Sequence, residues 1–243
     1  MPFGFGRMMG GNMGNWPFNE IRFMSRFDDA GSTLGITYQS VKRKHFYALQ
    51  KENRVTAPDV FYTSPLPTDI LEKKDDGTLW MRQALSERDS KDDVLLKYFN
   101  KQTELVTMPD GYKAVDRFAC TGKNIAGTFG NILSTEPIRS FVKKGNSWKE
   151  LPVPDGFTFS YVQKIFEDGM ILGFVTDANR ENMKQVIWDG DKIAILSDSP
   201  AWPKSGKYSL VINATRRGDI YVRNVLNTES GSNENYMIHV SRK

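Results

Sequence analysis

The sequence predicts an all-β protein built from a repeated unit, because glycine turns recur at a regular spacing and the segments between them favour strands. A glycine turn followed by a short apolar segment occurs five times in the 243 residues, at Gly31, Gly77, Gly122, Gly169 and Gly218. Subtracting these positions gives spacings of 46, 45, 47 and 49 residues. A period between about 20 and 50 residues is typical of repeat architectures.

Each repeat is expected to hold four short strands, and the fourth repeat shows them most clearly. An alternating segment there leads into Asp168-Gly169, and an Asp-Gly pair is a strong signal for a two-residue hairpin. The segments are rich in β-branched and aromatic residues and are bounded by Gly, Asp and Pro, which favours strands. The four expected strands are residues 159–166, 170–176, 184–188 and 192–196.

Four-stranded units of about 45 residues predict a β-propeller, in which each twisted blade covers the faces of its neighbours. Five glycine turns predict five antiparallel blades. The blades are expected at residues 19–57, 66–107, 112–152, 157–197 and 207–243. Their inner strands are expected at residues 20–27, 69–74, 113–120, 159–166 and 208–215.

The last blade is expected to lack its outer strand, because its third strand, at residues 235–242, takes up the remaining sequence. Residues 1–18 are rich in Gly and Met and form an expected arm that could supply the missing strand. A partner chain, or a second copy of this chain, could add that strand instead, and a disordered terminus is the third interpretation. The expected contact residues of the arm are Phe3, Phe5, Met8 and Met9.

The composition sets limits on function. A single cysteine, Cys120, excludes an internal disulfide, and His45 and His239 leave little material for histidine-based metal or triad chemistry. We therefore expect no cofactor and no metal. The net charge of +4 is spread along the chain, so nucleic-acid binding is not expected. No apolar run suits a membrane span or a secretion signal, so we expect a location in the cytoplasm or in a viral or other macromolecular assembly.

Two of the repeats carry a more specific pattern. An apolar step ending in glycine, Ile125-Ala126-Gly127 or Ile171-Leu172-Gly173, precedes the Trp-Asp-Gly turn of Val186-Ile187-Trp188-Asp189-Gly190. This order resembles the HAF-type repeats, a group of WD40-like propeller-forming sequences. The resemblance covers about two of the five units and implies a fold without a particular chemistry.

The expected binding residues lie in the connections between blades, which gather on one face of a propeller. These connections carry aromatic residues next to proline, and such rigid rings offer contact area at a small entropic cost. The alternative is that the rings wedge between blades. The candidates are Tyr62, Tyr112, Phe157 and Trp202.

Three functions remain open from the sequence. The first is a non-catalytic protein-interaction or structural module, for example a component of a virus particle. The second is a lectin-like propeller that binds carbohydrate in pockets repeated between blades. The third is a glycoside hydrolase built on Asp116, which lies within an inner strand, and a second carboxylate such as Glu72. We expect the first, with no catalytic residues.

Overall fold

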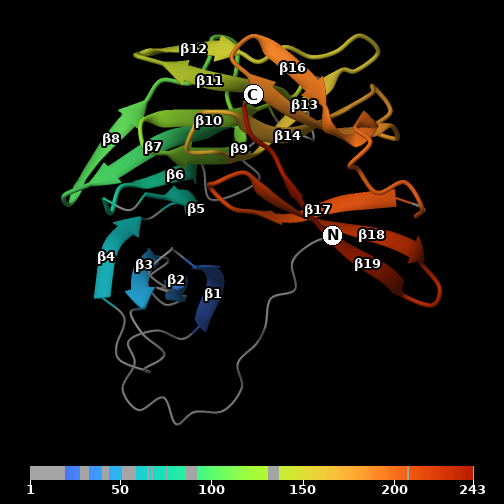
Figure 1. The fold of residues 1–243 in the computed structure, drawn as a ribbon. Coiled ribbons are helices and arrows are strands. Elements are labelled where there is room, and N and C mark those ends of the chain that lie inside the picture. Colours follow the sequence, from blue (N-terminus) through green and yellow to red (C-terminus); the bar gives the residue numbers. More distant parts are fainter. Residues whose placement is uncertain are drawn as a thin grey trace. The chain divides into compact units, whose positions relative to one another are not determined.

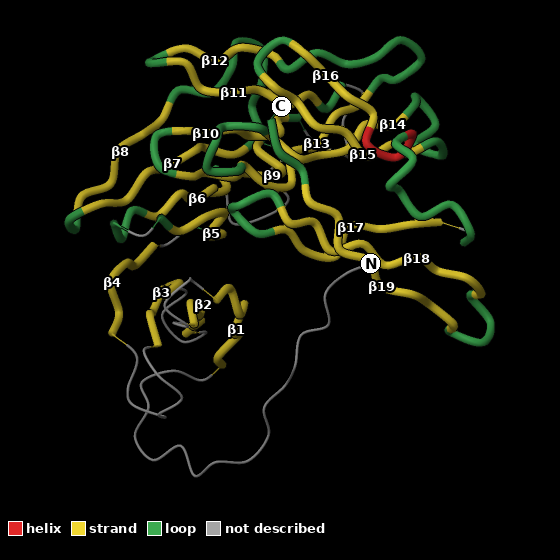
Figure 2. The backbone as a smooth tube through the Cα atoms, in the orientation of Figure 1, coloured by secondary structure: helices red, strands yellow, loops and turns green. Residues whose placement is uncertain are grey.

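The computed structural model confirms an all-β chain. It describes residues 20–27, 33–39, 44–50, 59–64, 66, 68–74, 76–85, 92–130, 137–206 and 208–242, with backbone alone at 20–64, 70 and 73. Strands and loops make up almost all of the described chain, and a short 3-10 helix, Leu196–Asp198, adds a single turn (Figure 2). The chain divides into two compact units, Met1–Val106 and Thr107–Lys243.

The first unit contains two antiparallel four-stranded sheets, each made of consecutive strands (Figure 1). The first sheet is β1 (Glu20–Phe27), β2 (Thr33–Gln39), β3 (Lys44–Gln50) and β4 (Asp59–Ser64). The second sheet is β5 (Thr68–Lys73), β6 (Leu79–Ala84), β7 (Asp93–Phe99) and β8 (Gln102–Val106).

The first sheet ends later than the sequence predicted. Its inner strand matches the expected residues 20–27, but its fourth strand runs to Ser64 rather than ending by residue 57. Tyr62 therefore lies within β4, opposite Tyr47 of β3, and not in the connection between two sheets. Pro58 marks the entry to the outer strand, since a proline is tolerated where a strand begins.

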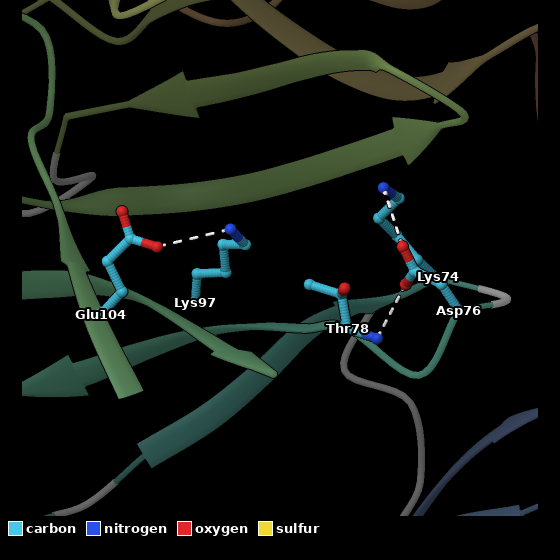
Figure 3. A network of polar contacts seen from close by, with 5 residues as sticks. All are labelled: Lys74, Asp76, Thr78, Lys97 and Glu104. Carbon is cyan, nitrogen blue, oxygen red and sulfur yellow. Dashed lines mark hydrogen bonds and ion pairs between the residues drawn. The ribbon is translucent and has the colours of Figure 1, made fainter. Parts of the chain in front are cut away.

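A hydrogen-bonded aspartate shapes the Asp-Gly turn between β5 and β6. The Asp76 carboxylate accepts a hydrogen bond from the Thr78 backbone N–H at 2.9 Å, and Lys74 Nζ lies 3.3 Å from its second oxygen (Figure 3). These partners, Thr78 first, hold the pKa of Asp76 below its ordinary value. Gly77 adopts a φ of 84°, a conformation that glycine takes without steric cost. Further along the sheet, Lys97 pairs with Glu104 across β7 and β8 at 3.3 Å.

The turn between β7 and β8 predicts a stabilising substitution. Asn100 and Lys101 both have positive φ, at 50° and 63°, and lysine pays a steric cost there that glycine avoids. Lys101→Gly is expected to raise the free energy of unfolding by about 0.5–1 kcal/mol in chemical denaturation. Lys192→Gly, at an exposed position of a regular strand, is the control and should lower it. A loss of stability in both variants would contradict the prediction.

The second unit contains three antiparallel sheets of consecutive strands (Figure 1). Their inner strands β9, β13 and β17 begin and end within two residues of the positions that the sequence predicted. The first sheet is β9 (Val115–Thr121), β10 (Asn124–Phe129), β11 (Arg139–Lys144) and β12 (Ser147–Glu150). The second is β13 (Phe159–Ile165), β14 (Ile171–Thr176), β15 (Met183–Asp189) and β16 (Lys192–Ile195). The third, with three strands among the described residues, is β17 (Tyr208–Ala214), β18 (Asp219–Asn227) and β19 (Ser232–His239).

The sheet β13–β16 packs on both of its neighbours in the second unit. One face forms an apolar core with the β9–β12 sheet, in which Ala126, Val186 and Trp188 are fully buried. The opposite face contributes Leu172 and Ile187 to a core shared with the sheet β17–β19. Two buried apolar interfaces thus hold the sheet in place, which fixes the strands that carry the candidate site.

Buried hydroxyl groups connect β13 to the β9–β12 sheet. Thr128 Oγ1 accepts a hydrogen bond from the Val162 backbone N–H, and Ser160 Oγ accepts one from the Ser140 N–H, both at 2.8 Å. Thr128 and Ser140 are themselves hydrogen-bonded through their hydroxyls at 3.2 Å. Since Thr128, Ser140 and Ser160 are fully buried, the network satisfies backbone groups that would otherwise lack partners.

Several sequence predictions fall outside the described residues. The arm at residues 1–18, with Phe3, Phe5, Met8 and Met9, is among them, so its pairing with the last sheet stays a prediction. In the part of the chain that is described, no helix has the length and apolar character needed to cross a membrane.

Candidate binding site

The aromatic residues predicted to bind a ligand are engaged in packing. Trp202 is 6% exposed and belongs to the core between the sheets β13–β16 and β17–β19. Phe157 is half-buried against the core that contains Trp188. The half-buried Tyr112 ring meets Phe141 edge-to-face, with centroids 5.1 Å apart. The contacts of Trp202 and Phe157 agree with rings that wedge between sheets, whereas Tyr112 packs on the β9–β12 sheet that follows it. The use of these rings in binding stays a prediction.

A different group of side chains, which the sequence did not single out as a site, gathers on one face of β13 and β14. Tyr161 and Phe174 are directly opposite each other in the two strands, and their rings stack at 4.5 Å with an interplanar angle of 15°. The Arg117 guanidinium, from β9, lies over both rings, 5.8 Å from the Tyr161 centroid and 5.3 Å from that of Phe174. Arg180 covers the Phe159 ring at 4.8 Å. We call Arg117, Phe159, Tyr161, Phe174 and Arg180 the arginine-aromatic cluster.

Strand alternation places the three rings together. Tyr161 lies two residues beyond Phe159 on β13, so both side chains point to the same face of the sheet. Phe174 joins them because the register of the hairpin sets it opposite Tyr161. Directly opposite side chains lie about 5 Å apart at their Cβ atoms, which is close enough for ring stacking.

A tight turn between β14 and β15 presents Arg180. The Arg180 backbone N–H donates to the Asp177 carbonyl at 3.1 Å, and the Asp177 carboxylate accepts from the Glu181 N–H at 3.0 Å. Arg180 has a φ of 63°, a strained conformation for a residue with a long side chain. Strain of this kind is concentrated at binding and catalytic sites, which singles out Arg180 within the loop.

The electrostatics of the cluster combine two cations, one anion and a neutral phenol. Asp116 Oδ2 lies 3.4 Å from Arg117 Nε, and the two side chains are 38% and 47% exposed. Burial raises the pKa of Tyr161 above its ordinary value, so its hydroxyl is protonated at neutral pH. The charged groups that act on Tyr161 are the cations Arg180 and Arg117 and the anion Asp116.

Two buried polar side chains lie on the same face as the rings. Gln185 of β15 is directly opposite Phe174, and Thr176 of β14 is directly opposite Phe159. They are 3% and 5% exposed. Among the described residues, Gln185 Oε1 and Thr176 Oγ1 have no hydrogen-bond partner. Buried polar atoms are nearly always hydrogen-bonded in proteins, so these two unpaired atoms are an unusual feature of this face.

The stacked aromatic pair of the cluster lies in one sheet, although the backbone position that carries it recurs. Three inner hairpins each contain a register shift. The residue pair that stands second before this shift has different side chains in each hairpin. It is the stacked pair Tyr161–Phe174 in β13–β14, the ion pair Asp69–Arg82 in β5–β6, at 2.8 Å, and Leu210–Arg223 in β17–β18.

The structure gives Asp116, the carboxylate considered for hydrolysis, a cationic neighbour. Its carboxylate lies 3.4 Å from the Arg117 guanidinium, and Cys120 of the same strand is a buried thiol. Within the described ranges, no group of three or more His, Cys, Asp or Glu side chains is placed to hold a metal ion. The site that the described residues form is therefore one of cations and aromatic rings.

The comparisons with known proteins concern the fold. No protein-family model matches the chain, and no curated protein matches it by sequence. The β-propeller domain of the Trilobed protease from Pyrococcus furiosus, which has an open velcro topology, is 13% identical, with a TM-score of 0.58 over 88% of this chain and 67% of that one. TolB from Acinetobacter baumannii is 15% identical, with a TM-score of 0.53 over 86% of this chain, which spans about half (52%) of that protein. The chain therefore resembles β-propeller proteins in its fold, while its resemblance to HAF-type repeats stays a prediction.

Proposed function

We propose that the chain is a five-bladed β-propeller that acts as a non-catalytic protein-interaction module, with the arginine-aromatic cluster as its contact site. The blade number is supported by five sheets of consecutive strands, each with its own glycine turn in the sequence. A role in a larger assembly stays a prediction, which is based on the three-stranded fifth sheet and on the arm at residues 1–18.

The observation that carries this proposal is the pair of guanidinium groups held over aromatic rings. Arginine and tyrosine are enriched among the residues that dominate protein–protein binding energies. Ring faces keep the guanidinium groups in place by cation–π attraction, which lowers the entropic cost of binding. Arg117 remains 47% exposed although Tyr161 beneath it is buried, so its hydrogen-bond donors are presented to a partner.

The geometry favours binding over the two alternatives. A glycosidase of the usual kind needs two carboxyl groups about 5–10 Å apart, whereas Asp116 is paired with Arg117. A lectin with repeated pockets needs equivalent side chains in several sheets. The position of the Tyr161–Phe174 pair holds an ion pair, Asp69–Arg82, in one other sheet, which favours a single site.

Selection from a phage-displayed library of random peptides tests the proposal. Peptides that bind the wild-type chain should be enriched, and most should lose binding to Tyr161→Ala, because this change removes one of the two rings over which the Arg117 guanidinium lies. Tyr221→Ala, which removes an exposed tyrosine from β18, is the matched control and should retain the selected peptides. Failure to enrich any peptide, or equal loss in both variants, would reject the cluster as a protein-binding site.

A further inference from the structure

We propose that the arginine-aromatic cluster recognises the carboxylate side chain of an acidic peptide, held between the guanidinium groups of Arg117 and Arg180. This inference rests on the proposed function and names its ligand. It is carried by the hydrogen-bonding capacity of the arginines, by the local charge and by the buried polar atoms on the same face.

The arginines have donors to spare. Each guanidinium carries five N–H donors in a planar fork that matches a carboxylate. Asp116 Oδ2 lies 3.4 Å from Arg117 Nε. In the described part of the chain, the two Nη groups of Arg117 have no hydrogen-bond partner. Within the same described ranges, the interaction of the Arg180 guanidinium is its contact with the Phe159 ring. A carboxylate can therefore bind without displacing an existing ion pair.

The local charge fits a single carboxylate. Among the charged groups that act on Tyr161, the cations Arg117 and Arg180 outnumber the anion Asp116 by one, which a single carboxylate balances. Single-stranded nucleic acid requires a track of cations that follows successive phosphates, and the positive charge of this chain is spread instead of aligned. The cluster thus suits one acidic side chain better than a polyanion.

The surroundings suit a peptide. The half-buried Phe159 and Phe174 rings offer apolar contact for the methylene groups of a glutamate. Gln185 Oε1 and Thr176 Oγ1, on the same face, lack partners among the described residues. A peptide brings backbone N–H donors alongside its carboxylate, and such donors, directly or through a bound water, complete the hydrogen bonding of this face.

Fluorescence anisotropy with a defined probe tests the inference. The probe is a short fluorescein-labelled peptide of alternating glutamate and serine, and its counterpart has glutamine in place of each glutamate. We expect the glutamate peptide to bind at least about tenfold more tightly than the glutamine peptide, because charge-assisted hydrogen bonds are about twice as strong as neutral ones. The difference should shrink as salt is raised, since the arginines are exposed.

Three variants of equal charge change localise the binding. Arg117→Ala and Arg180→Gly should each weaken binding of the glutamate peptide by about tenfold. Glycine at position 180 relieves the positive φ, so this variant should fold at least as well as the wild type. Arg223→Ala, at an exposed position of β18, is the control and should bind as the wild type does.

Defined outcomes overturn the inference. They are equal affinity for the glutamate and glutamine peptides, equal weakening by Arg223→Ala, or preferential binding of a labelled oligothymidine that depends on the same arginines. A library that yields neutral peptides sensitive to Tyr161→Ala would reject the acidic ligand while leaving the protein-interaction module intact. A library that yields no peptide would reject the cluster as a protein-binding site.

Discussion

Replacement of Trp188 by alanine is expected to lower the free energy of unfolding by about 3–5 kcal/mol, as for other large aromatic residues removed from a protein core. Trp188 is fully buried in the core between the sheets β9–β12 and β13–β16. Its indole N–H donates a hydrogen bond to the Pro152 carbonyl at 2.7 Å, so the substitution leaves both a cavity and an unpaired carbonyl.

Chemical denaturation of this variant and of Trp148→Ala measures the effect. Trp148 also donates its indole N–H to a backbone carbonyl, that of Thr107 at 2.8 Å, but its side chain is half-buried. The Trp148 variant should therefore lose clearly less stability than the Trp188 variant. Equal losses would show that burial of Trp188 does not dominate the stability of the second unit.

The substitution Gly173→Ala is expected to destabilise the chain by about 1–3 kcal/mol or more, through overpacking and not through a cavity. A Cβ atom at Gly173 would lie too close to the Tyr161 backbone carbonyl and to the Trp188 ring. The carbonyl belongs to a strand pair and cannot turn aside without breaking the register of β13 and β14.

Gly127→Ala is the matched control, because Gly127 holds the corresponding place in the hairpin of β9 and β10. The atoms nearest to its added Cβ would be ring atoms, the closest from Phe129 at 2.8 Å, and a ring can shift where a backbone cannot. Thermal and chemical denaturation should show the smaller loss at Gly127. The reverse order would mean that the β13–β14 hairpin adjusts its backbone more easily than its packing indicates.

Much of the fold could be predicted from the sequence because its turns are local. The glycine turns and their spacing placed the inner strands of the second unit within two residues of their observed ends. The first sheet runs past the expected blade end at residue 57, because its fourth strand begins at Asp59, directly after Pro58 in the sequence. A proline signals a boundary without saying on which side the strand lies.

The candidate site was less accessible to sequence reasoning. The turn at Gly169 alone would place Phe174 opposite Val162, and the register shift between Val162 and Lys164 places it opposite Tyr161 instead. Arg117 reaches the rings from another sheet, and Arg180 reaches them from a turn residue at positive φ. Neither position can be recognised from a periodic pattern in the sequence. Proline drew attention to Trp202, whose surroundings are those of a core residue.

The paired position that recurs in the inner hairpins tolerates side chains of different chemistry. The same backbone register carries a stacked pair at Tyr161–Phe174, an ion pair at Asp69–Arg82 and a mixed pair at Leu210–Arg223. Two substitutions in one hairpin are thus enough to exchange aromatic for ionic chemistry while the strand pairing is kept. Divergence of specificity, in evolution or by engineering, can proceed at these paired positions without a redesign of the sheet.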